Sequence, residues 1–414
     1  MKRPDAPRHF DVAVVGASLA GCTAARLFAR RGARVALIER RADPSAYKVT
    51  CTHAILSPAT PVLHRLGLAR QLTERGVPRT RPRFWTPHGG WVDVPDDFPT
   101  GWGVTRRTLD PMLRDLAAST AGVELFCGWS AARVVFDGSR PAGLEARDRR
   151  GRALQIRAPL LVAADGREST VARLSGVAGR VRPHNRFFYF AYWRGLKQVG
   201  TPSSAVRLWL LDPDGAAEFP NEDDLTLLVA AFHRSRLAEV RADLEGCYSR
   251  HLAKLADGPD LSGAERVSKM LGKLEVPNVL RPAARPGIAF VGDAALATDP
   301  LFGAGITFAF QSAQWLVDET SGALDGGQQL DRALDRYRRR HLWRLGPHHL
   351  QIADYSSGRQ LWPLERLILR RAAEDPELAR GLGEVLARER SIVRWLAPGF
   401  AARLAIPRRA APAA

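Results

Sequence analysis

The chain has few cysteines, no long apolar run and no leader-like N-terminus. Its four cysteines, Cys22, Cys51, Cys127 and Cys247, do not stand at the paired spacings of a zinc site or a disulfide framework. No stretch approaches the roughly 18 apolar residues that span a bilayer, and residues 1–10 lack the pattern of a secretory signal. We therefore expect a cytoplasmic protein with reduced thiols, no metal site and no membrane insertion.

Acidic residues are also scarce relative to basic ones. The net charge is +18, mostly from arginines spread along the chain rather than gathered in a nucleic-acid-binding module with interleaved aromatics. We expect a charged surface and no nucleic-acid partner. A basic protein that binds nucleic acid or a membrane surface through its arginine-rich C-terminal helices is the remote alternative.

A dinucleotide fingerprint stands near the N-terminus. The strand-like residues 12–15 lead into GASLAG at 16–21 and a helix near 20–31, and a second strand at 34–38 ends in Glu39. The first and last glycines allow a tight turn and close helix packing, and the helix N-terminus offers free N–H groups to a pyrophosphate. Ser18 stands where a glycine is usual. The residues expected to bind the dinucleotide here are Gly16, Ser18, Leu19, Ala20, Gly21, Glu39 and Arg40.

Two further buried strands end in carboxylates. Residues 160–164 run into Asp165-Gly166, and residues 288–291 run into Gly292-Asp293, followed by DPLFGAGI at 299–306 and a helix. Ligands of open α/β sheets bind at the carboxyl ends of strands. These segments therefore belong to the same predicted site, although an isolated Asp-Gly is more often a simple turn.

The order and spacing of the three segments resemble the flavoprotein group A monooxygenases, the para-hydroxybenzoate hydroxylase-like family, over most of residues 10–330. The resemblance implies FAD, with Asp293 on the ribitol and the helix N-terminus after Gly303 facing the flavin ring. It also implies that Arg106, with Arg107 as the competing choice, contacts the diphosphate or ribose side, and that Asp165 lies near the pyrophosphate. The implied cofactor residues of these segments are Arg106, Asp165, Gly292, Asp293, Pro300, Gly303, Ala304, Gly305 and Ile306.

The resemblance also implies a reaction. One nucleotide fold is visible, so NADH or NADPH would act as a transient reductant, unless a separate flavin reductase supplies the electrons. Oxygen would then form a flavin C4a-hydroperoxide that hydroxylates or epoxidises an aromatic or polyketide-like molecule, in secondary metabolism. His53, in the family loop that passes over the flavin, and Pro300 are the catalytic candidates. The oligomeric state stays open.

The predicted fold class is α/β, with a Rossmann-like FAD-binding domain, an inserted β-rich substrate domain and a helical C-terminal region. The FAD-binding domain would comprise residues 1–78, 102–178 and 280–330, the substrate domain 79–101 and 179–279, and the helical region 331–414. Aromatic and β-branched runs at 187–193, 206–210 and 225–232 predict the substrate sheet. Its candidate substrate-binding residues are Trp85, Tyr192, Arg207, Trp209 and His233.

Other flavin enzymes on this scaffold compete with this interpretation. The segment at 299–303 also resembles flavin-dependent halogenases and geranylgeranyl reductase-like proteins. The Trp-x-Trp-x-Ile-Pro segment of the halogenases has no match in the sequence. A reductase would turn over without oxygen.

Overall fold

Parallel strands form the centre of the molecule. The computed structural model describes residues 6–197 and 205–395. Its six-stranded sheet has the order β21 (Ala284–Arg285), β22 (Ile288–Phe290), β12 (Leu160–Ala163), β2 (Val12–Val15), β3 (Val35–Glu39) and β8 (Val123–Cys127). Every neighbour pair is parallel except β21 with β22. Strands β2, β3 and β12 are buried along their whole length, as expected of apolar runs covered on both faces.

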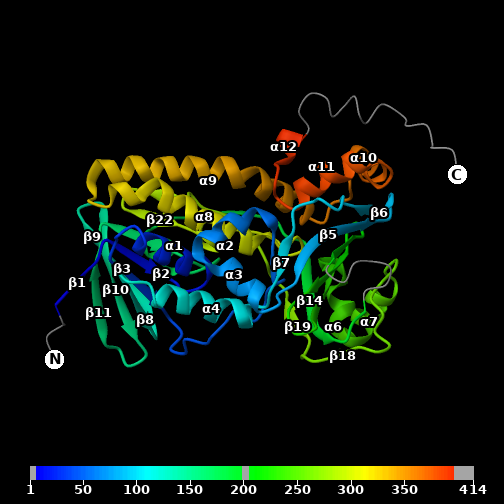
Figure 1. Ribbon diagram of the computed structural model, residues 1–414, viewed down its shortest axis with the longest axis horizontal. Coiled ribbons are helices and arrows are strands. Elements are labelled where there is room, and N and C mark those ends of the chain that lie inside the picture. The colour runs from blue at the N-terminus through cyan, green and yellow to red at the C-terminus, as the bar shows by residue number, and fades with distance from the viewer. Residues whose placement is uncertain (1–5, 198–204, 396–414) are drawn as a thin grey trace.

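Helices and a second sheet cover the two faces of this parallel sheet. α1 (Leu19–Ala29) packs against α4 (Arg106–Ala118) and α8 (Ala304–Thr320), and α9 (Gly327–Tyr355) lies along α8 (Figure 1). The second sheet has the order β1 (Arg8–His9), β11 (Ala153–Arg157), β10 (Arg140–Asp148) and β9 (Trp129–Asp137), and its strand β10 packs against β12. The helices α2 (Thr60–Leu66), α3 (Leu68–Glu74) and α5 (Thr170–Leu174) complete this half of the molecule.

A ten-stranded sheet occupies the other half (Figure 1). Its main path is β18 (Glu265–Arg266), β14 (Arg186–Arg194), β17 (Leu225–His233), β16 (Gly215–Pro220), β15 (Ala205–Leu210), β5 (Arg79–Thr86), β7 (Gly101–Gly103) and β4 (Ala54–Ile55), with β6 (Gly90–Asp93) beside β5 and β19 (Leu271–Lys273) beside β14. One face packs under α6 (Leu237–Ala242) and α7 (Leu244–Ala253). The other face packs against α8, α9, α10 (Pro363–Glu374) and α11 (Pro376–Leu386).

Short elements join the two halves. One of them is a three-stranded sheet of β13 (Arg180–Arg182), β20 (Asn278–Leu280) and β23 (Leu296–Ala297). In the sequence, β13 comes just before β14 of the large sheet and β20 comes after β19. α12 (Ile392–Trp395) ends the described part, so residues 396–414 of the predicted helical region lie outside the described residues. In the described ranges, no helix combines the length and the hydropathy needed to cross a bilayer.

The predicted fold class is confirmed: a Rossmann-like α/β unit, a β-rich unit and C-terminal helices are all present. Strands of the parallel sheet come from sequence regions separated by the strands of the large sheet. Because the strands are distributed between the sheets in this way, we propose the division into an FAD-binding domain, a substrate domain and a helical region that the sequence predicts. The predicted bounds of single elements differ from the observed ones by at most two residues, for example the helix near 20–31 against Leu19–Ala29 for α1, and the strand at 12–15 is observed with the same bounds as β2.

Candidate functional site

The turn between β2 and α1 has two glycines at positions where a side chain would clash with the backbone. Gly16 has φ of +104°, and a Cβ there would lie 2.4 Å from the Ala164 carbonyl oxygen. A Cβ on Gly21 would lie 1.8 Å from the Gly16 carbonyl oxygen. The N-cap of α1, Ser18, makes no side-chain capping bond and the first turn holds no acid. The first N–H groups of α1 are therefore available to an anion.

Glu39 closes this turn from the end of β3. Its Oε2 accepts the N–H of Ala17 at 2.9 Å and its Oε1 accepts the N–H of Arg41 at 3.0 Å. The carboxylate is thus held beside the turn, where the ribose of a dinucleotide would lie. Arg40, also predicted here, is exposed. Leu19 and Ala20 are buried in the core, so only their backbone N–H groups can serve a ligand.

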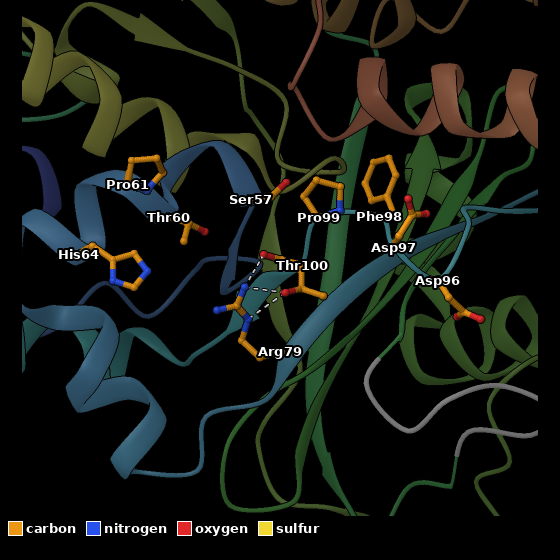
Figure 2. A pocket seen from close by; sticks show the side chains of 10 residues that line it. All are labelled: Ser57, Thr60, Pro61, His64, Arg79, Asp96, Asp97, Phe98, Pro99 and Thr100. Carbon is orange, nitrogen blue, oxygen red and sulfur yellow. Dashed lines mark hydrogen bonds between the residues drawn. The ribbon is translucent and has the colours of Figure 1, made fainter.

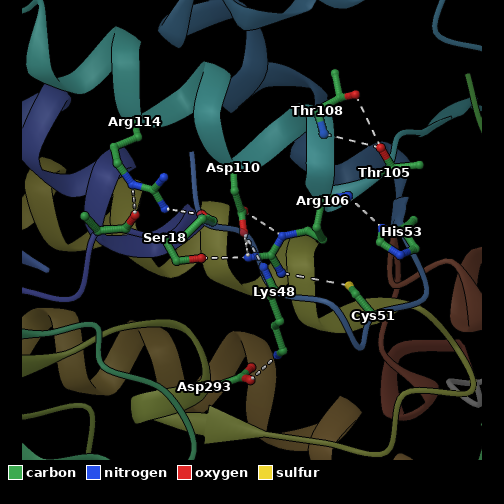
Figure 3. A network of polar contacts seen from close by, with 12 residues as sticks. Ser18, Lys48, Cys51, His53, Thr105, Arg106, Thr108, Asp110, Arg114 and Asp293 are labelled. Atoms are coloured by element: carbon green, nitrogen blue, oxygen red, sulfur yellow. Dashed lines mark hydrogen bonds and ion pairs between the residues drawn. The ribbon is translucent and has the colours of Figure 1, made fainter. Parts of the chain in front are cut away.

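Arg106 links α4 to the N-cap of α1 (Figure 3). Its Nε and Nη2 donate to the two carboxylate oxygens of Asp110 at 2.7 and 2.9 Å, and Nη2 also donates to Ser18 Oγ at 2.6 Å. Arg106 is 4% exposed, whereas the competing Arg107 points to solvent. The geometry therefore favours Arg106 at the dinucleotide turn.

Two basic residues of this network, Arg114 and Lys48, were not predicted from the sequence. Arg114 is buried and its Nε donates to the Ala17 carbonyl at 3.1 Å, which fixes the turn from the side of α4. Lys48 Nζ pairs with Asp293 Oδ2 at 3.3 Å (Figure 3). A signal for Arg114 was present, because residues 106, 110 and 114 are polar at four-residue spacing, which places them on one face of a helix. Lys48 gave no such signal.

The second predicted end of the site is the loop before α8. Gly303 has φ of +66° and is the N-cap of α8, which again lacks a side-chain cap and an acid in its first turn. Burial would raise the pKa of Asp293, but Lys48 and Arg167 outweigh it and hold that pKa below its usual range. A Cβ on Gly305 would have Asp293 Oδ1 as its nearest neighbour, at 3.9 Å. Asp293 therefore stands as a carboxylate beside a free helix N-terminus.

Other residues of this loop are used by the scaffold. Asp299 is buried, and its carboxylate accepts the Leu301 N–H at 2.7 Å and lies 2.8 Å from His184 Nε2. Gly292 packs against α1, since a Cβ there would lie 3.0 Å from the Cβ of Ala20. The carbonyl of Pro300 accepts the Gly303 N–H at 2.9 Å. Ala304 and Ile306 are buried, so they offer only backbone groups.

Asp165 makes its contacts within its own loop. Its carboxylate accepts the Ser169 hydroxyl at 2.6 Å and the Val171 N–H at 2.9 Å, which caps α5. Contact between Asp165 and a nucleotide stays a prediction.

His53 and Tyr192 meet between the two ends of the site. The backbone N–H of Arg106 donates to His53 Nδ1 at 2.8 Å, and His53 Nε2 is hydrogen-bonded to the Tyr192 hydroxyl. Burial, with Arg106 and Lys48, lowers the pKa of His53 to about 3, so the ring is neutral. Because Nδ1 accepts a hydrogen bond, the ring proton is on Nε2, and Tyr192 is left free to donate its own proton elsewhere. Burial raises the pKa of Tyr192, which keeps it a phenol.

The backbone of His53 is strained as well. Its φ is +59°, a conformation that non-glycine residues avoid and that costs about 1–3 kcal/mol. Nearby, a Cβ on Gly303 would lie 3.6 Å from Thr52 Oγ1 and 3.6 Å from the Phe219 ring. The loop holding His53 therefore runs close to the N-terminus of α8.

Most of the predicted substrate residues lie elsewhere. Side chains alternate along a strand, and Tyr192 shares the face of Phe188 and Phe190 that packs toward α8 and α9. Trp85 and Trp209 pack on the opposite face, toward α7.

Arg207 and His233 are also separated from Tyr192. Arg207 follows the alternation onto the α7 face, where its side chain is fully buried, paired with Glu218 and donating to the Asp257 carbonyl at 2.6 Å. His233 lies six pairs along β14 and β17 from Tyr192, about 20 Å at the rise of a strand. The expectation that Trp85, Arg207, Trp209 and His233 join Tyr192 in one pocket is therefore corrected, because strand parity and position separate them.

A surface depression of about 720 Å³ is lined by a different set of residues (Figure 2). It is lined by Ser57, Thr60, Pro61, His64, Arg79, Asp96, Asp97, Phe98, Pro99 and Thr100, none of which was predicted to bind cofactor or substrate. Arg79 donates hydrogen bonds to the Thr100 hydroxyl beside it.

The residues present fit FAD. Two uncapped helix N-termini suit the charged parts of a dinucleotide, and Gly16 and Gly21 allow the tight turn and the close helix packing that bring the first of them to the end of β2. The fold and site thus define an FAD-dependent oxidoreductase. A model of the FAD binding domain family matches residues 9–345, and the chain belongs to that family. The predicted resemblance to group A flavoprotein monooxygenases is confirmed at this level.

Individual relatives carry out different reactions. The chain is 24% identical to the digeranylgeranylglycerophospholipid reductase of Picrophilus torridus, over 80% of this chain and 82% of that protein. The flavin-dependent brominase Bmp2 superposes with a TM-score of 0.75 at 18% identity, covering 92% of this chain and 94% of that one. PqsL of P. aeruginosa, in complex with 2-aminobenzoylacetate, superposes with a TM-score of 0.68 at 20% identity, covering 91% and 99%. The family is therefore established, and the particular reaction is a separate question.

Proposed function

We propose that this protein is an FAD-dependent monooxygenase that inserts one oxygen atom into an aromatic or polyketide-like small molecule, by hydroxylation or epoxidation. NADH or NADPH, or a separate flavin reductase, would supply the electrons. Bound FAD supplies the redox chemistry and the activation of oxygen. The observation that carries the proposal is the neutral His53–Tyr192 pair on the α8-facing side of the large sheet.

The cofactor residues have separate tasks in this proposal. The N–H groups of the first turn of α1 bind the pyrophosphate, Glu39 the ribose, and Arg106 the diphosphate side. Asp293 binds the ribitol. The N-terminus of α8 after Gly303 would face the flavin ring and would favour negative charge on it.

The chain's own contribution to the reaction is positioning and proton control. Tyr192, oriented by His53, donates a hydrogen bond into the reaction site, and its raised pKa keeps that proton in place. The apolar face formed by residues such as Phe188, Phe190 and Phe219 excludes water from the substrate. Pro300, in the loop before α8, forms one boundary of the reaction site. Location in the cytoplasm and a role in secondary metabolism belong to the same proposal.

A reductase of geranylgeranyl-type substrates is the second candidate, favoured by the similarity to the Picrophilus torridus enzyme over most of both chains. A halogenase is favoured less, because its Trp-x-Trp-x-Ile-Pro segment has no match.

Oxygen consumption separates these candidates. The FAD-loaded protein is incubated with NADH or NADPH and a panel of aromatic and polyketide-like compounds under ¹⁸O₂. A monooxygenase gives a product heavier by one ¹⁸O atom and consumes one oxygen for each NAD(P)H. Turnover under strict anaerobiosis identifies a reductase, and a product that contains halogen when bromide or chloride is added identifies a halogenase.

A further inference from the structure

Arg388 is a buried arginine with half of its guanidinium unused. It lies in the turn between α11 and α12, is 4% exposed, and has φ of +69°. Its Nη1 donates to Gln351 Oε1 at 2.8 Å and to the Val385 carbonyl at 3.3 Å. Its Nε and Nη2 are buried without a partner. Among the described residues, none with a carboxylate forms an ion pair with it.

The free atoms form one edge of the guanidinium. Nε–H and Nη2–H point in parallel and match the two oxygens of a carboxylate. Two other buried arginines of this chain use that same edge on an acid: Arg106 on Asp110, at 2.7 and 2.9 Å, and Arg207 on Glu218. Arg186 also has unpaired nitrogens, but it lies close enough to Asp299 to lower the pKa of that acid.

An unpaired buried charge is costly, which argues against a purely structural role. Charges taken out of water are normally paired, and removing the partner of a buried ion pair costs several kcal/mol. The cost is visible in Arg388, since burial lowers its pKa to about 9. Contact with the Phe302 ring, whose centroid lies 4.9 Å from the guanidinium carbon, offsets part of it.

Arg388 also contacts the loop before α8 through Phe302. Phe302 directly precedes Gly303, the N-cap of α8. The surroundings are apolar: Phe302, Leu382, Val385 and Leu386 belong to the core between the large sheet and the C-terminal helices. His348 is close enough for Arg388 to affect it, but burial and Arg388 lower the pKa of His348 to about 3, so it adds no charge.

We propose that the Nε–Nη2 edge of Arg388 binds the carboxylate of the substrate, which is then an acid with an apolar body. This inference rests on the proposed function for the nature of the site. A single positive charge in apolar surroundings suits a carboxylate with one negative charge better than a phosphate with two. The carboxylate of the bound acid would lie against this edge, and its apolar body would extend into the apolar core between the large sheet and the C-terminal helices.

Entry to this edge requires the turn at 387–391 to move. The backbone N–H groups of Ala387, Arg388, Glu389 and Arg390 all bond to carbonyls of residues 383–385, at the end of α11. Because these backbone bonds are local, a shift of the turn with α11 would break the bond from Arg388 to Gln351 on α9 but no backbone bond to the large sheet.

The test measures binding of benzoate and decanoate, each against its amide, to the FAD-loaded protein by calorimetry and thermal unfolding, without NAD(P)H. We expect at least one acid to bind and its amide not to bind. Arg388→Met should weaken that acid about 10- to 100-fold, the range for hydrogen bonds to a charged group, and Arg388→Lys should also weaken it because the fork is lost. The matched control Arg390→Gln changes an arginine that pairs with Glu384 at the surface and should bind like the wild type.

Several results would overturn the proposal. These are binding of no acid in preference to its amide, equal binding by Arg388→Met and wild type, or tighter binding of phenyl phosphate than of benzoate. If Arg388→Met does not fold, Arg388→Lys gives the same comparison. Without ligand, Arg388→Met should unfold at a temperature equal to or above that of the wild type, whereas a structural arginine would make it unfold earlier. This test measures binding and no turnover. If the acid binds as expected but is not oxygenated in the ¹⁸O₂ assay described above, the result contradicts the proposed function and not the role of Arg388.

Discussion

Acid should destabilise this protein through three histidines buried on α9. His341, His348 and His349 are at most 5% exposed, and neither ring nitrogen of His349 has a hydrogen-bond partner. Burial lowers their pKa values to about 4, 3 and 4, with further lowering by His349 on His341, by Arg388 on His348 and by Arg182 on His349. In the unfolded chain each ring titrates near its ordinary value of 6.5. The folded state therefore excludes protons that the unfolded state binds.

The sign and size follow from this difference. The stabilisation is complete above about pH 6.5 and is lost as the pH falls from there toward about 4. One pH unit below 6.5, each histidine costs about 1.4 kcal/mol, so the three together cost about 4 kcal/mol. That is a large part of the 5–15 kcal/mol by which proteins of ordinary stability are folded. His53, with a pKa of about 3, adds to the same trend.

His349→Leu is the sharpest variant, because it removes a ring that makes no hydrogen bond. Urea unfolding at pH 7.5, 6.5 and 5.5, followed by circular dichroism, gives the free energy of unfolding at each pH. We expect the variant to lose about 1.4 kcal/mol less than the wild type between pH 7.5 and 5.5. His64→Gln, which changes an exposed ring on α2, should lose as much as the wild type. The same loss in His349→Leu as in the wild type would refute the reasoning.

Three further outcomes are expected. Gly21→Ala places a Cβ against the Gly16 carbonyl; the resulting shift of α1 costs about 1–3 kcal/mol, so the Kd for FAD, read from flavin fluorescence, should rise roughly tenfold or more. Glu218→Gln leaves the Arg207 charge buried and should lower the free energy of unfolding by about 3–5 kcal/mol, while KM for the substrate is unchanged; a changed KM with normal stability would restore Arg207 to the substrate site. Tyr192→Phe should lower kcat roughly tenfold, the value of one hydrogen bond, with FAD binding unaffected; an unchanged kcat would remove Tyr192 from the reaction.

Local patterns made the cofactor half of the site predictable. The turn at Gly16 and Gly21 needs only neighbouring residues to be recognised, since its steric demands arise within one strand, one turn and one helix. The carboxylates at Glu39 and Asp293 were found in the same way, as residues at the ends of apolar strands. What could not be predicted is the contact between Lys48 and Asp293, which joins residues 245 positions apart.

The substrate side was harder for a different reason. Alternation along a strand separates Tyr192 from Trp193, or Leu208 from Trp209, but it does not tell which set faces the cofactor. That choice depends on whether α7 or α8 and α9 cover a given face, which is decided by tertiary packing. The residue type alone predicts that the large aromatic residues line the pocket, whereas Trp209 packs under α7 and donates to the Ala256 carbonyl at 2.9 Å.

The excess of arginine has a structural use that needs no anionic macromolecule. Several arginines donate to backbone carbonyls rather than to acids: Arg26 to those of Leu66 and Leu116, and Arg167 to those of Pro277 and Thr298. Arg114 does the same at the dinucleotide turn. A guanidinium that ties two segments together through carbonyls adds a positive charge without requiring a negative one, so a chain built in this way accumulates net charge. The net charge of +18 therefore arises in part from arginines that link segments of the chain through backbone carbonyls. Arg388 differs from these arginines because the Nε–Nη2 edge of its guanidinium has no partner.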